Sequence, residues 1–376
     1  MKKRTLSYLL VSALVAVGTP KDSQKSKQTG DESPILHINL GDLGYHQSQE
    51  CTYKGTGVPR DLSVLNDDYK KRIVFIDDQS VVVYQSHCLP EKGSAPSPRS
   101  VEAFFVNPQS GMLIAKQSWP TIKRRWLNER WDTQARILAL ADGVAVQAGR
   151  SLMVYSARLE KKEELRLEDG PRWAASVAPQ GHTIHLQRIE DDNNARGEWL
   201  TSDTLKDLRS QNEMAGVVSV SDTAVVYKLA HCLQLQAIGE APRNLYCADA
   251  PHLGLPLFLT NSDVLSVYDK GFGVWSLDGG RLWGREVTKG TVLGSHKRSL
   301  QGNRFALLLS GPVVFDGISI PAKRSAILIY DRPMRAQIWH LISSDETGLT
   351  DFDISPDGSF LATVEDDTIR VYKIPK

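Results

Sequence analysis

The chain has 376 residues, of which 41% are hydrophobic and 24% are charged, and its formal net charge is +1. This composition is typical of globular proteins. A nearly neutral chain has no global field that would attract nucleic acid or an anionic membrane, so we expect neither as a partner.

The first 18 residues have the pattern of a secretory signal peptide. Basic residues occupy positions 2–4, an apolar run covers 6–17, and the small residues Ala16 and Gly18 have the spacing that an export peptidase prefers. The run is too short to cross a hydrocarbon core, which needs about 20 apolar residues. We therefore expect cleavage after Gly18 and a periplasmic or extracellular protein; the alternative is a buried N-terminal helix.

The mature chain is expected to contain a short linker and one folded unit. Residues 19–33 contain no large apolar side chain, which predicts a flexible linker. The folded unit is expected over 34–376. No other apolar stretch approaches membrane-spanning length, so no transmembrane segment is expected in the mature chain.

After residue 70 the sequence alternates apolar and polar residues in short runs that end at Gly, Asp, Asn or Pro. This pattern is typical of β-strands and turns. The segment 202–214 is the exception, because it predicts a helical turn or two. Similar strand-like units recur about every 44 residues, and repeats of this length with four strands each indicate a β-propeller. The recurring units are VEAFFVNPQSG, LMVYSARLE, GEWLTSDTL, HCLQLQAIG, FGVWSLDGG, AILIYDRPM and TIRVYKIP.

The last unit contains three strands and lacks an outer one. The run PILHINL at 34–40 stands alone ahead of the first full unit and can supply the missing strand. Pairing it with the strand TIRVYKI would complete the last blade, join the two ends of the chain and protect an exposed strand edge. The sequence therefore predicts an all-β, seven-bladed propeller with four antiparallel strands per blade, closed by its N-terminal strand.

This organisation resembles the divergent, WD40-like propellers of exported bacterial proteins. The segment SPDGSFLATVEDDTIRVY in the last blade carries the resemblance most clearly, and the resemblance covers about residues 34–376. The segment VWSLDGGRLWGRE at 274–286 also resembles the repeat of quinoprotein propellers. That resemblance implies that Trp283, and similarly Trp339, packs between neighbouring blades.

The four cysteines suggest two disulfides in an oxidising compartment, with three possible pairings. A hairpin centred near Gly239 would place Cys232 opposite Cys247, and cross-strand neighbours lie near disulfide reach. We therefore predict a Cys232–Cys247 bond and, by elimination, a Cys51–Cys88 bond.

Four longer segments are expected on one face of the propeller, namely 85–100, 118–131, 190–197 and 310–324. Long insertions on one face of a rigid scaffold commonly carry binding function. The segment 118–131 also has the densest group of Trp and Arg side chains, the residue types most enriched at interaction hot spots. The predicted partner-binding residues are Trp119, Arg124, Arg125, Trp126, Arg130 and Trp131. The alternative is that the Trp side chains cover a hydrophobic blade edge while the charges stay solvated.

The sequence favours an exported, monomeric binding or scaffold module over an enzyme. Its expected partner is a protein or a glycan that binds the top-face loops, and no cofactor is predicted. One alternative is a propeller hydrolase or lyase with a metal or catalytic cluster in the central channel. The innermost strands offer scattered polar candidates for such a cluster, namely Asp77, His296, Asp351 and Asp353. A quinone-dependent dehydrogenase is a second alternative.

Overall fold

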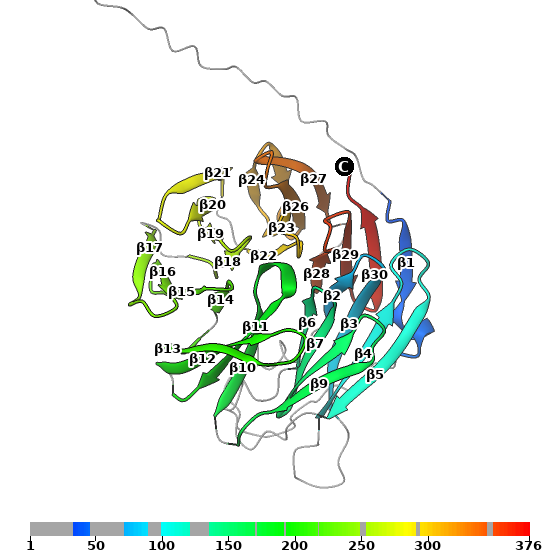
Figure 1. Ribbon diagram of the computed structural model, residues 1–376. Helices are drawn as coiled ribbons and strands as arrows, with labels where there is room; N and C mark the ends of the chain where they lie inside the picture. Colours follow the sequence, from blue (N-terminus) through cyan, green and yellow to red (C-terminus); the bar gives the residue numbers. More distant parts are fainter. Residues whose placement is uncertain are drawn as a thin grey trace, which may run out of the picture.

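The strands of the chain form seven antiparallel sheets arranged radially around one axis (Figure 1). We number these sheets blades 1 to 7 in the order of their innermost strands, and each has an innermost, a second, a third and a fourth strand counted from the axis. The predicted seven-bladed propeller is thereby confirmed. The computed structural model describes residues 33–45, 71–88, 99–120, 135–169, 171–191, 193–216, 218–248, 253–290, 294–343 and 349–376.

The innermost strands are short and lie around the axis, where they contact the innermost strands of neighbouring blades. Little space is available there, and β10 and β14 accordingly contain several small residues. The innermost strands are β2 (Arg72–Asp77), β6 (Arg136–Leu140), β10 (Arg172–Val177), β14 (Val218–Val220), β18 (Leu257–Phe258), β22 (Gly294–Arg298) and β28 (Asp351–Ile354).

The second and third strands form the core of each blade, because neighbouring blades cover both of their faces. Many of their residues are therefore apolar, and every position of β7 is buried. The second strands are β3 (Ser80–Cys88), β7 (Gly143–Ala148), β11 (Thr183–Ile189), β15 (Ala224–Leu229), β19 (Asp263–Tyr268), β23 (Arg304–Ser310) and β29 (Phe360–Glu365). The third strands are β4 (Arg99–Val106), β8 (Ser151–Ser156), β12 (Asn194–Thr201), β16 (Cys232–Ala237), β20 (Gly271–Ser276), β26 (Ser325–Asp331) and β30 (Thr368–Lys373).

The fourth strands form the outer rim and are more polar. Most side chains of β9 and β13 are exposed, and charged residues on such a rim oppose pairing with a foreign strand. β13 lies within 202–214, so the predicted helical turns there were wrong. A strand exposed on both faces lacks the apolar alternation that identifies a strand. The fourth strands are β5 (Leu113–Pro120), β9 (Lys161–Arg166), β13 (Asp207–Met214), β17 (Arg243–Cys247), β21 (Arg281–Lys289), β27 (Ala336–Ile342) and β1 (Leu36–Asn39).

The N-terminal strand closes blade 7, as predicted from residues 34–40. β1 pairs antiparallel with β30, with Leu36 opposite Val371. Ile38 and Leu40 are 6% and 0% exposed, and both belong to a core shared by blades 7 and 1. The first and last strands of the described chain therefore lie side by side (Figure 1).

Two tryptophans pack between blades, as the sequence predicted. The ring of Trp283 in blade 5 lies 5.8 Å from the ring of Phe305 in blade 6. The ring of Trp339 in blade 6 lies 5.9 Å from that of Tyr372 in blade 7. Both side chains therefore join neighbouring blades.

The connection between β23 and β26 folds as a hairpin and is not an exposed loop. Its strands β24 (Val313–Phe315) and β25 (Ile318–Ile320) pair with each other, and β24 pairs with β21, so blade 5 has six strands. Asp316 and Gly317 have φ values of 49° and 81°, the positive values that a type I′ turn requires. Apolar side chains of the hairpin are buried in a core shared by blades 5 and 6. The expectation that 310–324 is a free binding loop is thereby corrected.

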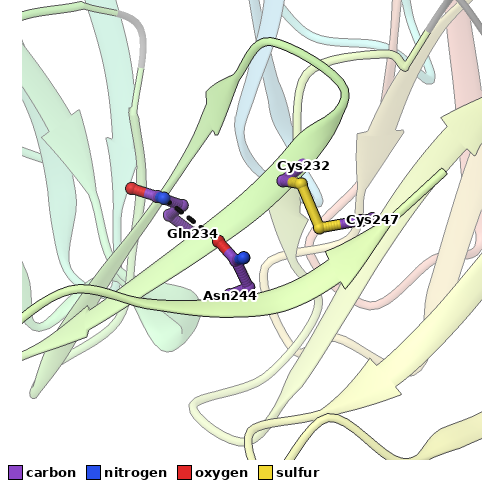
Figure 2. The surroundings of a disulfide bond; sticks show 4 residues. All are labelled: Cys232, Gln234, Asn244 and Cys247. Atoms are coloured by element: carbon purple, nitrogen blue, oxygen red, sulfur yellow. Dashed lines mark hydrogen bonds between the residues drawn. A yellow bond between two sulfur atoms is a disulfide. The ribbon is translucent and has the colours of Figure 1, made fainter.

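The predicted Cys232–Cys247 disulfide is present at one end of blade 4. The two residues are directly opposite each other in β16 and β17, with their Cα atoms 4.0 Å apart. Figure 2 shows this bond and, further along the same strand pair, the hydrogen bond from Gln234 Nε2 to Asn244 Oδ1 of 3.0 Å.

A short 3₁₀ turn, η3 (Pro179–Gly181), reaches from blade 3 to blade 6 on the other side of the ring. The backbone N–H of Gln180 donates to the carbonyl oxygen of Leu300 at 3.1 Å. Gly181 has a φ of 76°, and a Cβ atom there would lie 2.4 Å from the nitrogen of Ala141, so only glycine fits. The turn lies at the end of the ring at which the innermost strands end, as the green turn between the labels β22 and β11 in Figure 1 shows.

Another 3₁₀ turn, η1 (Leu40–Leu43), follows β1. Within the described segments, no helix is long and apolar enough to cross a membrane.

Candidate interaction face and axial channel

The direction of the strands decides which loops share a face. Because the strands alternate in direction, the connections from second to third strands leave from the same end of the ring as the connections between blades. We call this end the top face and the opposite end, where η3 lies, the bottom face. The segments 85–100, 118–131, 190–197 and 310–324 all contain connections that leave from the top face.

Most of the predicted partner-binding residues lie outside the described residues, in the connection between β5 and β6. Their role in binding stays a prediction. These residues are Arg124, Arg125, Trp126, Arg130 and Trp131. The predicted Cys51–Cys88 bond also stays a prediction, because Cys51 and the side chain of Cys88 are not described either.

Trp119 is placed in the core and not on the surface. Its side chain in β5 is 6% exposed and belongs to a cluster formed by blades 1 and 2. The indole Nε1–H donates a hydrogen bond of 2.9 Å to the hydroxyl of Tyr155 in blade 2. A packing role therefore replaces the predicted partner contact for Trp119.

The connection between β11 and β12 is a tight turn, shorter than the predicted loop 190–197. Asp191 Oδ1 accepts hydrogen bonds of 2.8 Å from the backbone amides of Asn193 and Asn194. A side-chain hydrogen bond from Asn194 and these amides lower the pKa of Asp191. The carboxylate is therefore used to hold the turn.

A cluster on the top face of blade 3, not predicted from the sequence, combines an aromatic ring with charged groups. Trp173 and Arg188 are directly opposite each other in β10 and β11, and the guanidinium carbon lies 6.0 Å from the ring centroid. Arg188 also lies 3.3 Å from a carboxylate oxygen of Glu168, whose backbone carbonyl accepts a hydrogen bond from Trp173 Nε1. We call these three residues the Trp173–Arg188 cluster.

Two carboxylates on β28 bind the neighbouring innermost strand. Asp351 Oδ2 accepts a hydrogen bond of 3.1 Å from the N–H of Ile73, and Asp353 Oδ2 accepts one of 2.8 Å from that of Phe75. Burial raises the pKa of Asp353 to about 6, although the charge of Lys297 acts in the opposite direction. Asp351 and Asp353 thus accept hydrogen bonds from backbone N–H groups on the inner edge of β2, where no further strand can pair.

Two arginines lie along the inner edge of β10. Nη1 of Arg136 in blade 2 donates to the carbonyl oxygen of Ala175 at 3.0 Å, and Nη2 of Arg298 in blade 6 donates to that of Val177 at 3.3 Å. Because blades 3 and 6 are on opposite sides of the ring, the side chain of Arg298 reaches across the axial channel.

His296, the polar candidate on β22, is half-buried beside Lys297. Burial and the charge of Lys297 lower the pKa of His296 to about 4, so this imidazole is neutral at physiological pH. Across the described ranges, no group of three or more His, Cys, Asp or Glu side chains could hold a metal ion.

No protein-family model matches the sequence, and no curated protein matches it either. Many solved structures resemble the fold. Three of them are "Crystal structure of RRP9 WD40 repeats" (TM-score 0.51, 9% identity, covering 82% of this chain and 95% of that chain), "Structure of U3-55K" (TM-score 0.50, 9% identity, 81% and 96%) and "Crystal Structure of Mitotic Checkpoint Complex" (TM-score 0.51, 11% identity, 100% and 100%). At these identities the similarity concerns the fold alone. The chain therefore has the seven-bladed propeller fold of WD40-repeat structures.

Proposed function

We propose that the protein is an exported, non-catalytic interaction module that binds a protein partner through the top face of blades 1 to 3. One observation carries the proposal: the Trp173–Arg188 cluster lies on the face from which the Trp- and Arg-rich connection between blades 1 and 2 leaves. Large aromatic side chains and arginines are the residue types most enriched at binding hot spots. Propellers host many functions, so the residues of this face have to distinguish among them.

The charges of this face favour an acidic partner surface. Arg124, Arg125 and Arg130 belong to the connection itself. Arg188 of blade 3 is already paired with Glu168 and adds a guanidinium plane beside Trp173. In such an interface the aromatic rings would supply apolar contact area, while the guanidinium groups would orient carboxylates of the partner.

The first test compares two variants that differ in the face they change. Arg125→Ala with Trp126→Ala alters the top face, and Arg158→Ala with Lys206→Ala alters exposed turns on the bottom face. Partners are recovered by cross-linking in the native compartment, and their affinity is then measured with purified components. We expect the top-face variant to bind at least tenfold more weakly, because truncating a hot spot costs on the order of 2 kcal/mol, and the control to bind like the wild type.

Equal binding by the top-face variant and the wild type would show that the partner surface lies elsewhere. A melting temperature well below that of the wild type would instead show that Trp126 is a packing residue, as Trp119 is.

The second test addresses export. Intact mass spectrometry of the protein from its native source should show a chain that begins at Thr19, recovered outside the cytoplasm. A variant without residues 2–18 should stay in the cytoplasm. Recovery of the unprocessed wild-type chain from the cytoplasm would contradict export.

A further inference from the structure

The axial channel contains more positive than negative charge. Within the described residues, electrostatic interactions around Lys297 and the Tyr84 hydroxyl link four basic side chains to two carboxylates. The basic residues are Arg72, Arg136, Lys297 and Arg298, and the acidic ones are Asp351 and Asp353. This group, the axial basic cluster, therefore has an excess of two positive charges when all six side chains are ionised.

The two carboxylates compensate Lys297, whose pKa their charges raise against the opposing effect of burial, but they leave the two arginines less well compensated. Each carboxylate already accepts a backbone hydrogen bond from β2, and the pKa of Asp353 is raised to about 6. The Nζ atom of Lys297 lies 3.9 Å from Asp351 Oδ1, at the outer limit of an ion pair. Burial lowers the pKa of Arg136, and it lowers that of Arg298 to about 10. Such shifts arise where a buried cation lacks sufficient negative charge nearby.

The two arginines are spaced to act together. They bind carbonyl oxygens two residues apart on the same strand edge, which places these carbonyls about 7 Å from each other along the strand. The Nε–H of Arg298 is buried and has no hydrogen-bond partner in the described part of the chain. A buried donor without an acceptor is costly, so this geometry favours an acceptor in the channel.

Solvent can reach the axial basic cluster, and the position of η3 indicates from which end of the ring it does so. The side chain of Lys297 is 34% exposed, and Arg72, Arg136 and Arg298 are half-buried. The turn η3 follows Val177, the residue whose carbonyl Arg298 binds, and its hydrogen bond to Leu300 crosses the bottom face there. A ligand would therefore enter the channel from the top face.

We propose that the axial basic cluster binds a doubly charged oxyanion of the phosphate type, with Arg136, Lys297 and Arg298 as its ligands. Guanidinium groups match the oxygen geometry of phosphate, and lysine adds a point charge. A dianion would also balance the excess charge of the cluster. The ligand is either free phosphate or the phosphoryl group of a small molecule. This site is separate from the proposed partner surface, and the proposal of the site does not depend on that surface.

The test uses the full mature chain and isothermal titration calorimetry at constant ionic strength. Sulfate, inorganic phosphate and glycerol phosphate are the probes. We expect sulfate and phosphate to compete for a single site per chain, and tighter binding of glycerol phosphate would identify the ester as the better ligand. Arg298→Gln should weaken binding at least tenfold, because glutamine removes the charge while it keeps a polar side chain at this position. Arg158→Gln on an exposed turn is the matched control and should bind like the wild type.

A further variant is expected to have the opposite effect on sulfate binding. Asp353→Asn removes negative charge beside Arg298 and should tighten sulfate binding severalfold, which a merely structural role would not predict. Arg136→Gln replaces Arg298→Gln if the latter does not fold. Absence of saturable binding to the wild type, or equal affinity in the wild type and both arginine variants, would overturn the proposal.

Discussion

Side chains of one blade satisfy the inner edge of the next innermost strand at several positions around the ring. Gln147 in blade 2 donates to the carbonyl oxygen of Trp173 and accepts from the N–H of Ala175. Ser219 in blade 4 accepts from the N–H of Phe258. An innermost strand has one edge without a neighbouring strand, and leaving its polar groups unpaired would cost free energy. Polar residues near the axis therefore have a structural use before any functional one.

The structural role of Asp353 can be measured through the pH dependence of the free energy of unfolding. Its pKa in the folded protein is about 6, above the ordinary value of 3.8, so between these values the folded chain holds a proton that the unfolded chain releases. The stability contributed by this group is therefore full below about pH 4 and is lost as the pH rises through 6. Asp353→Asn keeps an oxygen acceptor for Phe75 but cannot ionise. We expect the stability advantage of the variant over the wild type to be larger at pH 7.5 than at pH 4.5 by about 2 kcal/mol.

Urea unfolding at both pH values measures this difference. Glu160→Gln on an exposed turn is the control and should match the wild type at both. A difference between Asp353→Asn and the wild type that does not change with pH would contradict the assignment.

At the scale of elements, the β24–β25 hairpin changes what blade 5 presents to solvent. It covers the edge of β21 and buries Phe315, which is 0% exposed and lies near Phe272. Truncating a buried phenylalanine removes its transfer free energy and leaves a cavity. We expect Phe315→Ala to lower the free energy of unfolding by about 3 kcal/mol, measured by denaturant titration.

Ser319→Ala, on the exposed side of the same hairpin, should change the free energy of unfolding by less than about 0.5 kcal/mol. If Phe315→Ala is equally mild, the hairpin does not contribute to the core of blade 5.

At the scale of the whole molecule, closure of the propeller depends on β1. This strand completes blade 7, although the other strands of that blade lie at the opposite end of the sequence. β1 pairs with β30 and contributes Ile38 to the core between blades 7 and 1. Deleting residues 19–40 should lower the melting temperature severely, because it exposes this core and the edge of β30. Deleting 19–33 alone should leave the melting temperature unchanged, since β1 starts at Leu36. Scanning calorimetry of both deletions decides, and an unchanged transition after the longer deletion would contradict closure by β1.

The sequence by itself determined the repeated architecture, the closing strand and the Cys232–Cys247 pairing. Strand alternation and turn residues are local features, and consecutive strands pair with each other, so chain order predicts most of the ladder. The hairpin in 310–324 also had a local signal, since Asp316–Gly317 stands between two apolar runs.

The tertiary structure decided which side chains are buried and which meet. The burial of Trp119 depends on Tyr155 in the next blade, and the hairpin's docking depends on the edge of β21. The axial basic cluster assembles residues that are far apart in sequence, such as Arg298 and Val177, which are separated by 121 positions. Such contacts depend on the ring closing around an axis, and no local pattern encodes the distance across it.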